Sequence, residues 1–303
     1  MLTLLRSLLL LPLLLLFVAL PVLMASTATA TTGSKAPVTD LTVIARQLER
    51  TAAHQEHALP PNKVLNVCAV PQLYLALQAL STKSRYPFVP RVATATEIYA
   101  LIANTDNSKL PLLCDMVLSA DERLPISLVR SQKALASSLV PFARVPLVLW
   151  SANPNLLQGH DPRDLLQSGA ITSMAVANPQ LTPVGFATAQ VLKGPLALSR
   201  TRSLREHLYR ADHEYQVYSM VANANVDCGF ISKPLLLSEG AALQGSYWEV
   251  PRRFHPDIQY YGVLLSPSVA NKLAQDFLRY LVEDEDVHRF LNDYGFAPLR
   301  SSF

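Results

Sequence analysis

The chain has 303 residues, half of them apolar, and a formal net charge of only +3 at neutral pH. That charge is too small to predict a nucleic-acid-binding or membrane-surface protein, which would carry a concentrated basic patch. About 270 residues remain after an N-terminal leader, enough for one large domain or two smaller ones with cores of their own.

Residues 1–30 have the pattern of a signal peptide. A single charged residue, Arg6, precedes an apolar run over residues 8–24, and Ala28-Thr29-Ala30 matches the small-residue pattern of a cleavage site. The run is short for a membrane span and ends in small residues, which favours a cleaved leader over an uncleaved anchor. Cleavage would remove Arg6 and lower the formal net charge from +3 to +2. We therefore expect an exported, periplasmic protein in which residues 31–60 form an N-terminal extension.

Predicted strands and helices alternate along the remaining chain. Apolar runs predict strands at residues 64–70, 88–92, 115–119, 144–150, 171–176, 227–232 and 259–265. Helical spacing and capping patterns predict helices at residues 41–57, 71–80, 97–103, 186–193, 213–224, 267–281 and up to 294, with shorter ones opening at 120 and 161. Residues 105–113 are expected to form a loop. This alternation, without internal repeats, predicts an α/β protein with mostly parallel sheets flanked by helices.

The segment NPQLTPVGFATAQVLKG, residues 178–194, predicts a turn followed by a helix that runs from about Phe186 to a C-cap at Gly194. The first backbone N–H groups of a helix have no internal partner and carry partial positive charge, so an uncovered helix start can bind an anion. Gly185 would allow a ligand to approach that backbone closely. The alternative is an ordinary turn between a strand and a helix.

Loops of the same kind recur along the chain. In α/β folds, ligands bind at the carboxyl ends of strands, where loops meet helix N-termini. Small, hydroxyl-bearing or glycine-bearing loops between a predicted strand and a predicted helix occur at residues 71–72, 94–96, 183–185 and 232. We expect these loops to surround a ligand.

The three cysteines, Cys68, Cys114 and Cys228, each lie in an apolar, strand-like stretch. They are interpreted as buried small hydrophobic residues. In an oxidising compartment one disulfide is the alternative, but the spacing does not assign its pairing.

Five segments in this order resemble the periplasmic molybdate-binding proteins of ABC importers, which have the type II periplasmic solute-binding fold. The segments are VLNVCAVPQLYLAL, CDMVLSADE, PQLTPVG, VDCGFIS and FLNDYGFAPL, and the resemblance covers residues 63–299. It implies two α/β lobes that are joined by crossing strands and close over an anion by hinge motion. Residues 61–142 and 258–303 would form lobe 1, and residues 143–257 would form lobe 2.

The resemblance also implies a ligand set in which backbone N–H groups and hydroxyls hold the oxyanion without a cation. The corresponding positions are Gln72, Thr94, Ala95, Val184, Gly185, Glu214, Tyr215 and Ser232. Two of them depart from the family pattern. Gln72 is larger than the usual serine, and Ser232 lacks the phenol of the family's pocket tyrosine. Glu214 would add negative charge unless its side chain points away.

The function that the resemblance implies is capture of molybdate or tungstate by a monomeric extracytoplasmic binding protein that serves an ABC importer permease. The alternative is a divergent relative that binds another small anion or acts in sensing without transport. An exported hydrolase is disfavoured, because the sequence has no G-x-S-x-G, no H-E-x-x-H and no clustered Cys/His set. We therefore expect no catalytic residues, no cofactor and no protein-bound metal.

Overall fold

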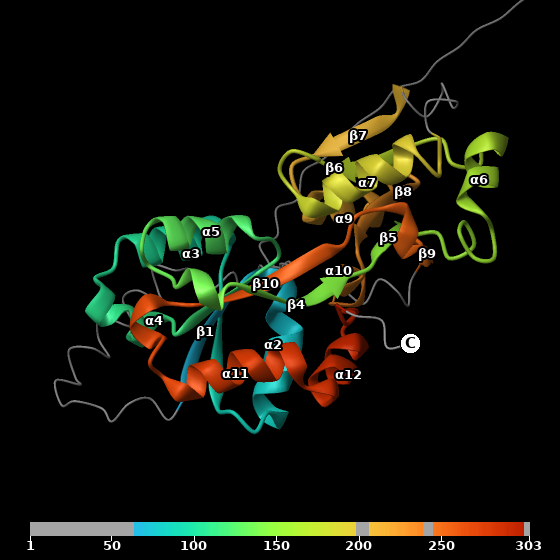
Figure 1. Cartoon of the computed structure of the whole chain (residues 1–303). Coiled ribbons are helices and arrows are strands. Elements are labelled where there is room, and N and C mark those ends of the chain that lie inside the picture. Colours follow the sequence, from blue (N-terminus) through green and yellow to red (C-terminus); the bar gives the residue numbers. More distant parts are fainter. Residues whose placement is uncertain (1–63, 198–205, 239–244, 300–303) are drawn as a thin grey trace, which may run out of the picture. The chain divides into compact units, whose positions relative to one another are not determined.

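The computed structural model describes residues 64–197, 206–238 and 245–299, all of which belong to one compact unit. The expected signal peptide, the N-terminal extension and the helix at residues 41–57 lie outside the described residues. The described chain forms two five-stranded sheets with helices packed on their faces (Figure 1). None of the described helices has the length and apolar character needed to cross a membrane.

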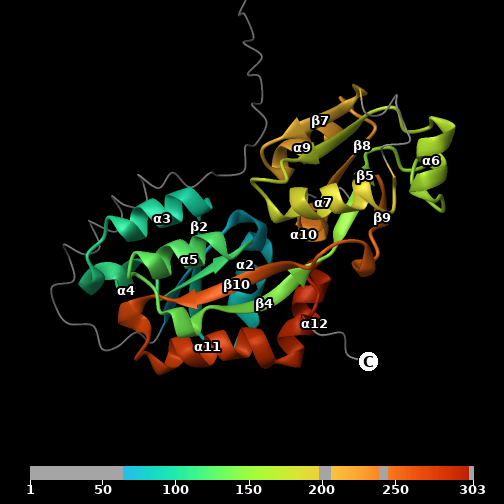
Figure 2. The same cartoon turned by 45° about the horizontal axis from the view of Figure 1, so that its top comes forward.

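The first sheet has the strand order β2-β1-β3-β10-β4. Its strands are β1 (Leu65–Ala69), β2 (Phe88–Val92), β3 (Met116–Ser119), β4 (Val140–Val145) and β10 (Ile258–Leu264). Strand β1 is parallel to β2 and β3, whereas β10 is antiparallel to both of its neighbours. Helices α3 (Ala95–Ala103) and α5 (Arg123–Arg130) lie on one face of this sheet, and α2 (Tyr74–Lys83) and α11 (Lys272–Glu283) lie on the other (Figure 2).

The second sheet has the order β7-β6-β8-β5-β9. Its strands are β5 (Leu147–Ser151), β6 (Met174–Ala177), β7 (Leu208–Ala211), β8 (Cys228–Ser232) and β9 (Ser246–Glu249). Strand β6 is parallel to β7 and β8, and β5 is antiparallel to β8 and β9. The predicted α/β fold is confirmed, and each sheet is mixed, with its parallel strands on one side.

The helices follow the strands in chain order. They are α2 (Tyr74–Lys83), α3 (Ala95–Ala103), α4 (Leu110–Leu113), α5 (Arg123–Arg130), α6 (Pro162–Ser168), α7 (Pro183–Lys193), α9 (Glu214–Ala222), α10 (Lys233–Ser238), α11 (Lys272–Glu283) and α12 (Glu285–Asp293). Short 3-10 turns lie at η1 (Pro71–Leu73), η2 (Asn107–Lys109), η3 (Ala136–Ser138), η6 (Arg252–Phe254) and η7 (Ser266–Ser268).

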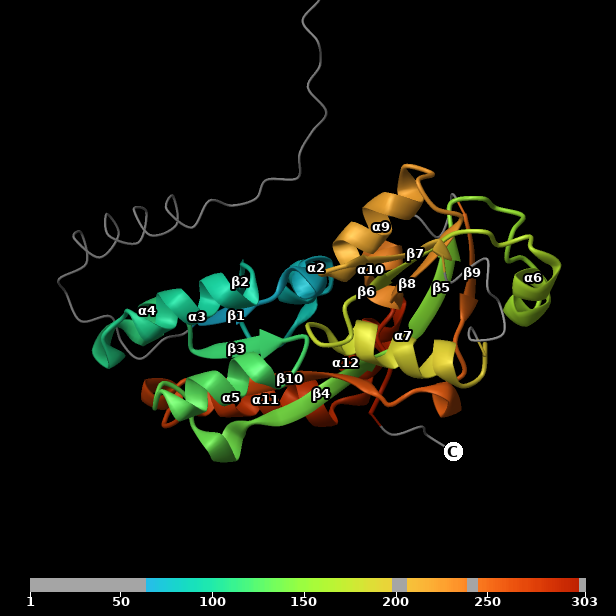
Figure 3. The same ribbon diagram turned by 90° about the horizontal axis from the view of Figure 1, so that it is seen from above.

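The second sheet is buried on both faces, which explains why its central strands are almost wholly apolar. Successive side chains of a strand point to opposite faces. Ala175 of β6 accordingly packs in a cluster with Val217 of α9, while its neighbour Met174 belongs to the cluster that contains Val191 of α7. Figure 3 shows α7 and α9 on the two faces of the sheet.

The single strand predicted at residues 144–150 is wrong. The structure has two strands there, β4 and β5, separated by Pro146, and they belong to different sheets. Proline lacks a backbone N–H and cannot continue a ladder, so it ends one strand and lets the next begin in another direction. The chain passes from the first sheet to the second at this residue.

Other local predictions differ from the structure at short or half-exposed elements. The loop expected at residues 105–113 contains η2 and α4, in which Leu110 and Leu113 are buried and Pro111 occupies the first turn, where a missing N–H costs nothing. Strands β7 and β9 and helix α10 were not predicted. Both strands lie at the edges of the second sheet, where partly exposed residues leave a weak sequence pattern.

Helix α7 begins at Pro183, three residues before the predicted start, because Thr182 caps it. The Thr182 hydroxyl accepts a hydrogen bond of 2.9 Å from the Gly185 backbone N–H. A Cβ atom at Gly185 would lie 2.5 Å from the carbonyl oxygens of both Ala177 and Asn178. The glycine therefore serves the close approach of the helix start to the preceding strand end, rather than the approach of a ligand.

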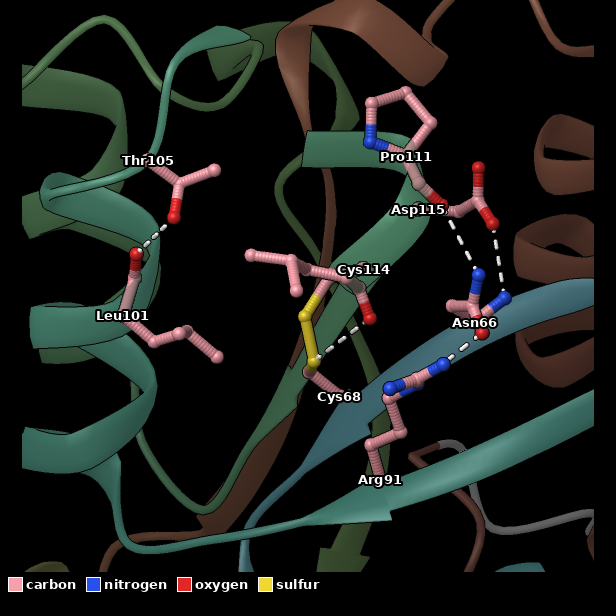
Figure 4. Close-up of a disulfide and its surroundings, with 9 residues drawn as sticks. Asn66, Cys68, Arg91, Leu101, Thr105, Pro111, Cys114 and Asp115 are labelled. Atoms are coloured by element: carbon pink, nitrogen blue, oxygen red, sulfur yellow. Dashed lines mark hydrogen bonds between the residues drawn. A yellow bond between two sulfur atoms is a disulfide. The ribbon is translucent and has the colours of Figure 1, made fainter. Parts of the chain in front are cut away.

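Cys68 and Cys114 form a disulfide, whereas Cys228 is free and buried. The interpretation of all three cysteines as unpaired hydrophobic residues is thus wrong for two of them. The bridge joins β1 to the residue that follows α4, next to the buried carboxyl of Asp115 (Figure 4). That carboxyl accepts hydrogen bonds of 2.8 Å from the Asn66 backbone N–H and from the Ser268 hydroxyl.

We predict that Gly185→Ala lowers the free energy of unfolding by at least about 2 kcal/mol, because the added methyl group meets rigid backbone carbonyls. Denaturant unfolding followed by circular dichroism measures this loss. Gly194→Ala is the matched control, since its Cβ would only touch Gln190 O at 3.2 Å on an exposed helix end. Equal stability of the two variants would contradict the packing role of Gly185.

We predict that Cys68→Ala with Cys114→Ala lowers the free energy of unfolding by about 2–4 kcal/mol, because the bridge closes a chain separation of 46 residues in the unfolded state. Cys228→Ala removes a buried sulfur without a cross-link and should cost about 1 kcal/mol. Thermal denaturation of oxidised samples compares the two. If the double variant Cys68→Ala/Cys114→Ala were as stable as Cys228→Ala, the bridge would not stabilise the fold.

Candidate functional site

A cavity of about 610 Å³ lies where loops of both sheets converge. Its lining comes from the loops that follow β1, β2, β3, β6 and β7, together with side chains of β10. Helices α3, α5, α7 and α9 all begin at these loops. Helix N-termini carry partial positive charge and N–H groups without internal partners, so their convergence favours an anionic or hydrogen-bond-accepting ligand.

Most of the residues that the sequence placed in a ligand site line this cavity. Those in the lining are Gln72, Thr94, Ala95, Val184, Glu214 and Tyr215. Gly185 and Ser232 are not in the lining: Gly185 packs against the preceding strand end, and Ser232 is buried at the end of β8. Three of the four loops expected to surround a ligand therefore meet at one cavity, and residue 232 lies behind it.

The hydroxyl of Thr94 is occupied by helix capping. It accepts a hydrogen bond of 3.3 Å from the Glu97 backbone N–H and donates one of 2.7 Å to the Glu97 carboxylate. The same carboxylate accepts from the Thr94 backbone N–H at 2.8 Å, which completes a capping box at the start of α3. A ligand bound here would compete with this cap for the hydroxyl proton.

The first turn of α7 presents few free donors to the cavity. Pro183 has no backbone N–H, and that of Gly185 is bonded to the Thr182 hydroxyl. Val184, which lines the cavity, is then the first-turn residue whose backbone N–H has no partner within the helix or its cap.

Glu214 is the most unusual group of the site. It is the first residue of α9 and lines the cavity, yet only 5% of its surface is exposed. One carboxyl oxygen accepts a hydrogen bond of 2.8 Å from the Ser232 backbone N–H, and the other accepts a long one of 3.4 Å from Gln72 Nε2. Burial raises the pKa of Glu214, while the hydrogen bonds from Ser232 and Gln72 oppose that rise. The sequence predicted that Glu214 adds negative charge unless its side chain points away, and the structure holds its carboxyl between Ser232 and Gln72 at the cavity.

Two polar atoms next to this carboxyl lack hydrogen bonds of normal geometry. They are Gln72 Oε1 and Ser232 Oγ, and both are buried. A buried polar atom without a partner costs free energy, of the order of 1–3 kcal/mol, unless a ligand or water supplies one. The neighbourhood of Glu214 therefore has unused hydrogen-bonding capacity, of which Gln72 Oε1 can only accept a hydrogen bond.

The charged side chains of the lining almost cancel. Arg123 is paired with Asp121, and its guanidinium also donates to the carbonyl oxygen of Leu181, which links the loops after β3 and β6. With this pair neutral and His213 counted as neutral, an ionised Glu214 leaves the lining with a formal charge of −1, and a protonated one leaves it uncharged. In this count the formal charge of the site depends on whether Glu214 carries a proton.

Tyr260 of β10 adds a phenol to the lining. Burial, with smaller contributions from the charges of Glu214, Tyr215 and Asp121, raises the pKa of Tyr260 well above its ordinary value. The phenol therefore keeps its proton and remains a donor.

Sequence reasoning missed Tyr99, Asp121, Arg123 and Tyr260 as lining residues. The Asp121 carboxylate accepts a hydrogen bond of 3.0 Å from the Arg123 backbone N–H at the start of α5. Asp121 lies in the loop between β3 and α5, and that position in a strand-to-helix loop was a signal that could have identified it as a lining residue. For Tyr260 no local signal existed, because the sequence does not reveal which face of β10 meets the site.

Within residues 64–197, 206–238 and 245–299 no group of His, Cys, Asp or Glu is suited to hold a metal ion.

Comparisons with known proteins agree on one family. A family model described as bacterial extracellular solute-binding protein matches residues 79–297. The molybdate-binding protein ModA of Azotobacter vinelandii is 30% identical over 167 residues, which cover 55% of this chain and 64% of the relative, so the match spans less than two thirds of that protein. The molybdate-binding protein ModA of Rhodobacter capsulatus is 26% identical over 183 residues, covering 60% of this chain and 69% of the relative.

A solved structure has the same fold. The periplasmic molybdate-binding protein of Azotobacter vinelandii matches with a TM-score of 0.60 and 24% identity, over 78% of this chain and 100% of that chain. The type II periplasmic binding-protein fold expected from the sequence is thereby confirmed. Because the family model matches residues 79–297, well over half of the chain, the chain belongs to the bacterial extracellular solute-binding proteins, which bind solutes and are not enzymes.

Proposed function

We propose that this chain captures a small oxyanion, molybdate or tungstate, outside the cytoplasm and delivers it to the permease of an ABC importer. The observation that carries the proposal is the convergence of four helix N-termini on one cavity. The similarity to two molybdate-binding proteins supports the choice of anion. A signal peptide at residues 1–30 would export the chain, and it would act as a monomer.

Within this proposal the anion is held by neutral donors rather than by a cation. The Val184 backbone N–H and the start of α9 at Glu214 and Tyr215 supply donors from the second sheet. Gln72 and the Thr94–Ala95 helix start supply them from the first. The two sets belong to different sheets, so a bound anion would join them, as hinge closure requires.

Tyr260 is proposed to replace the phenol that the chain lacks at Ser232. Ser232 is fully buried behind the cavity and offers its backbone N–H to Glu214. Tyr260 lines the cavity from β10, which is antiparallel to the strands whose loops form the site. The donor would therefore come from the first sheet instead of the second.

We predict that molybdate and tungstate raise the melting temperature by several degrees at a hundredfold excess over Kd, since binding to the native state alone adds about 2.7 kcal/mol. A thermal-shift panel with sulfate, phosphate and small carboxylates measures the selectivity, and sulfate should give little shift. If another anion alone stabilises the protein, the alternative of a divergent receptor replaces molybdate capture. If no anion does, the proposed function is wrong.

We predict that Tyr260→Phe weakens molybdate binding roughly tenfold, the effect of one lost hydrogen bond to a charged ligand. Isothermal titration calorimetry gives the two dissociation constants. Tyr261→Phe is the matched control, because Tyr261 is not in the lining and donates its hydroxyl to Gln259 at 2.9 Å. Unchanged affinity in Tyr260→Phe, or an equal loss in the control, would remove Tyr260 from the proposed ligand set.

A further inference from the structure

The donors and acceptors around Glu214 do not match a fully deprotonated oxyanion. A dianion needs donors, but the Ser232 backbone N–H and the Gln72 Nε2 group both already donate to the Glu214 carboxyl. The buried atom left over on the amide, Gln72 Oε1, is an acceptor. An ionised Glu214, itself almost fully buried, would also place a negative charge beside the incoming anion, which is costly without a paired cation.

We propose that the protein binds its oxyanion together with one proton, which is taken from solvent and carried by Glu214. This inference rests on the proposed function, because it concerns the same cavity. In the free protein the Ser232 backbone N–H and Gln72 Nε2 both donate hydrogen bonds to Glu214, and these bonds favour its ionised form. In the complex the carboxyl is neutral, and the lining then has no net formal charge.

The proton also rearranges the hydrogen bonds in favour of the anion. A protonated Glu214 keeps one oxygen as an acceptor for the Ser232 backbone N–H at the distance of 2.8 Å seen here. Its new O–H can donate to Gln72 Oε1 once the amide turns over, which gives that buried atom its missing partner. Gln72 Nε2 is then released from the carboxyl and can donate to the anion. One proton thus converts a donor-poor site into a donor-rich one.

Other groups near Glu214 could carry the proton instead, and they define the controls. His213 precedes Glu214 and lies in the lining, and Tyr215 follows it on α9. Gln72 on η1 and Ser232 on β8 contact the carboxyl and do not titrate. Tyr260 on β10 keeps its proton, and the Asp121–Arg123 pair lies at the start of α5. His213 is therefore the competing site for the proton.

The expected pH dependence follows from the direction of the shift. Burial raises the pKa of Glu214, although its hydrogen bonds limit the rise. Above the pKa of the free protein, Glu214 is ionised and binding must take up a proton. The association constant should then fall as pH increases, by about tenfold per pH unit for one proton. Below that pKa the proton is already present, and the association constant should be independent of pH.

The experiment is calorimetric titration of the full mature chain with molybdate, in two buffers that differ in ionisation enthalpy, between about pH 7 and about pH 9, where unperturbed carboxyls stay ionised. The wild type should take up about one proton per anion. Glu214→Gln, which is neutral and similar in shape, should take up none, show a flat pH profile and bind more tightly than wild type at the alkaline end. Glu283→Gln, an exposed acid at the end of α11, is the charge-matched control and should behave as wild type.

The outcomes separate this inference from the proposed function. Molybdate binding by wild type without proton uptake overturns the inference and leaves the proposed function standing. Proton uptake that persists in Glu214→Gln but disappears in His213→Gln assigns the proton to the histidine and also overturns it. Should Glu214→Gln fail to fold, the uptake by wild type and by His213→Gln still decides the question. A wild type that binds neither molybdate nor tungstate at any pH overturns both proposals.

Discussion

A buried carboxyl group governs the chemistry of the proposed binding site. Glu214 is almost completely removed from solvent and is held by a backbone N–H of β8 and by the amide of Gln72. A charge in such a place must be hydrogen-bonded or neutralised, because the surroundings solvate it poorly. An anion bound in the cavity would lie near this carboxyl, because Glu214 is part of the lining. The number of protons on one side chain therefore decides how many donors and how much negative charge the anion encounters.

The fold explains why the site lies where it does. Each sheet has three parallel strands, and the loops after β1, β2 and β3 of the first sheet and after β6 and β7 of the second line the cavity. The antiparallel strands β5 and β10 connect the two sheets. The chain enters the second sheet through β5 and returns to the first through β10. Two contacts, Gln72 with Glu214 and Arg123 with Leu181, already join loops of the two sheets across the cavity. In the proposed function, the loops that bind the ligand are therefore the same loops that link the two sheets.

The sequence predicted those features that depend on local pattern. Strands β1 and β3 are short, mostly apolar and almost wholly buried, so their runs were recognisable, and the loops after them followed from the topology. Features that depend on the partner of a residue were not predictable. The spacing of the cysteines did not show that Cys68 pairs with Cys114. The apolar run around Pro146 did not show that the strands on its two sides belong to different sheets. The direction of the Glu214 side chain likewise became visible only with β8 and η1 in place.

The most direct test of the account is the position of a bound heavy oxyanion. Crystals of the protein grown with tungstate allow tungsten to be located by its anomalous scattering. We expect one strong anomalous peak in the cavity, near the start of α7 and within hydrogen-bonding reach of the Val184 backbone N–H, with Gln72 turned away from its present contact with Glu214. A peak elsewhere on the molecule, or an empty cavity at saturating tungstate, would contradict the assignment of this site as the oxyanion pocket.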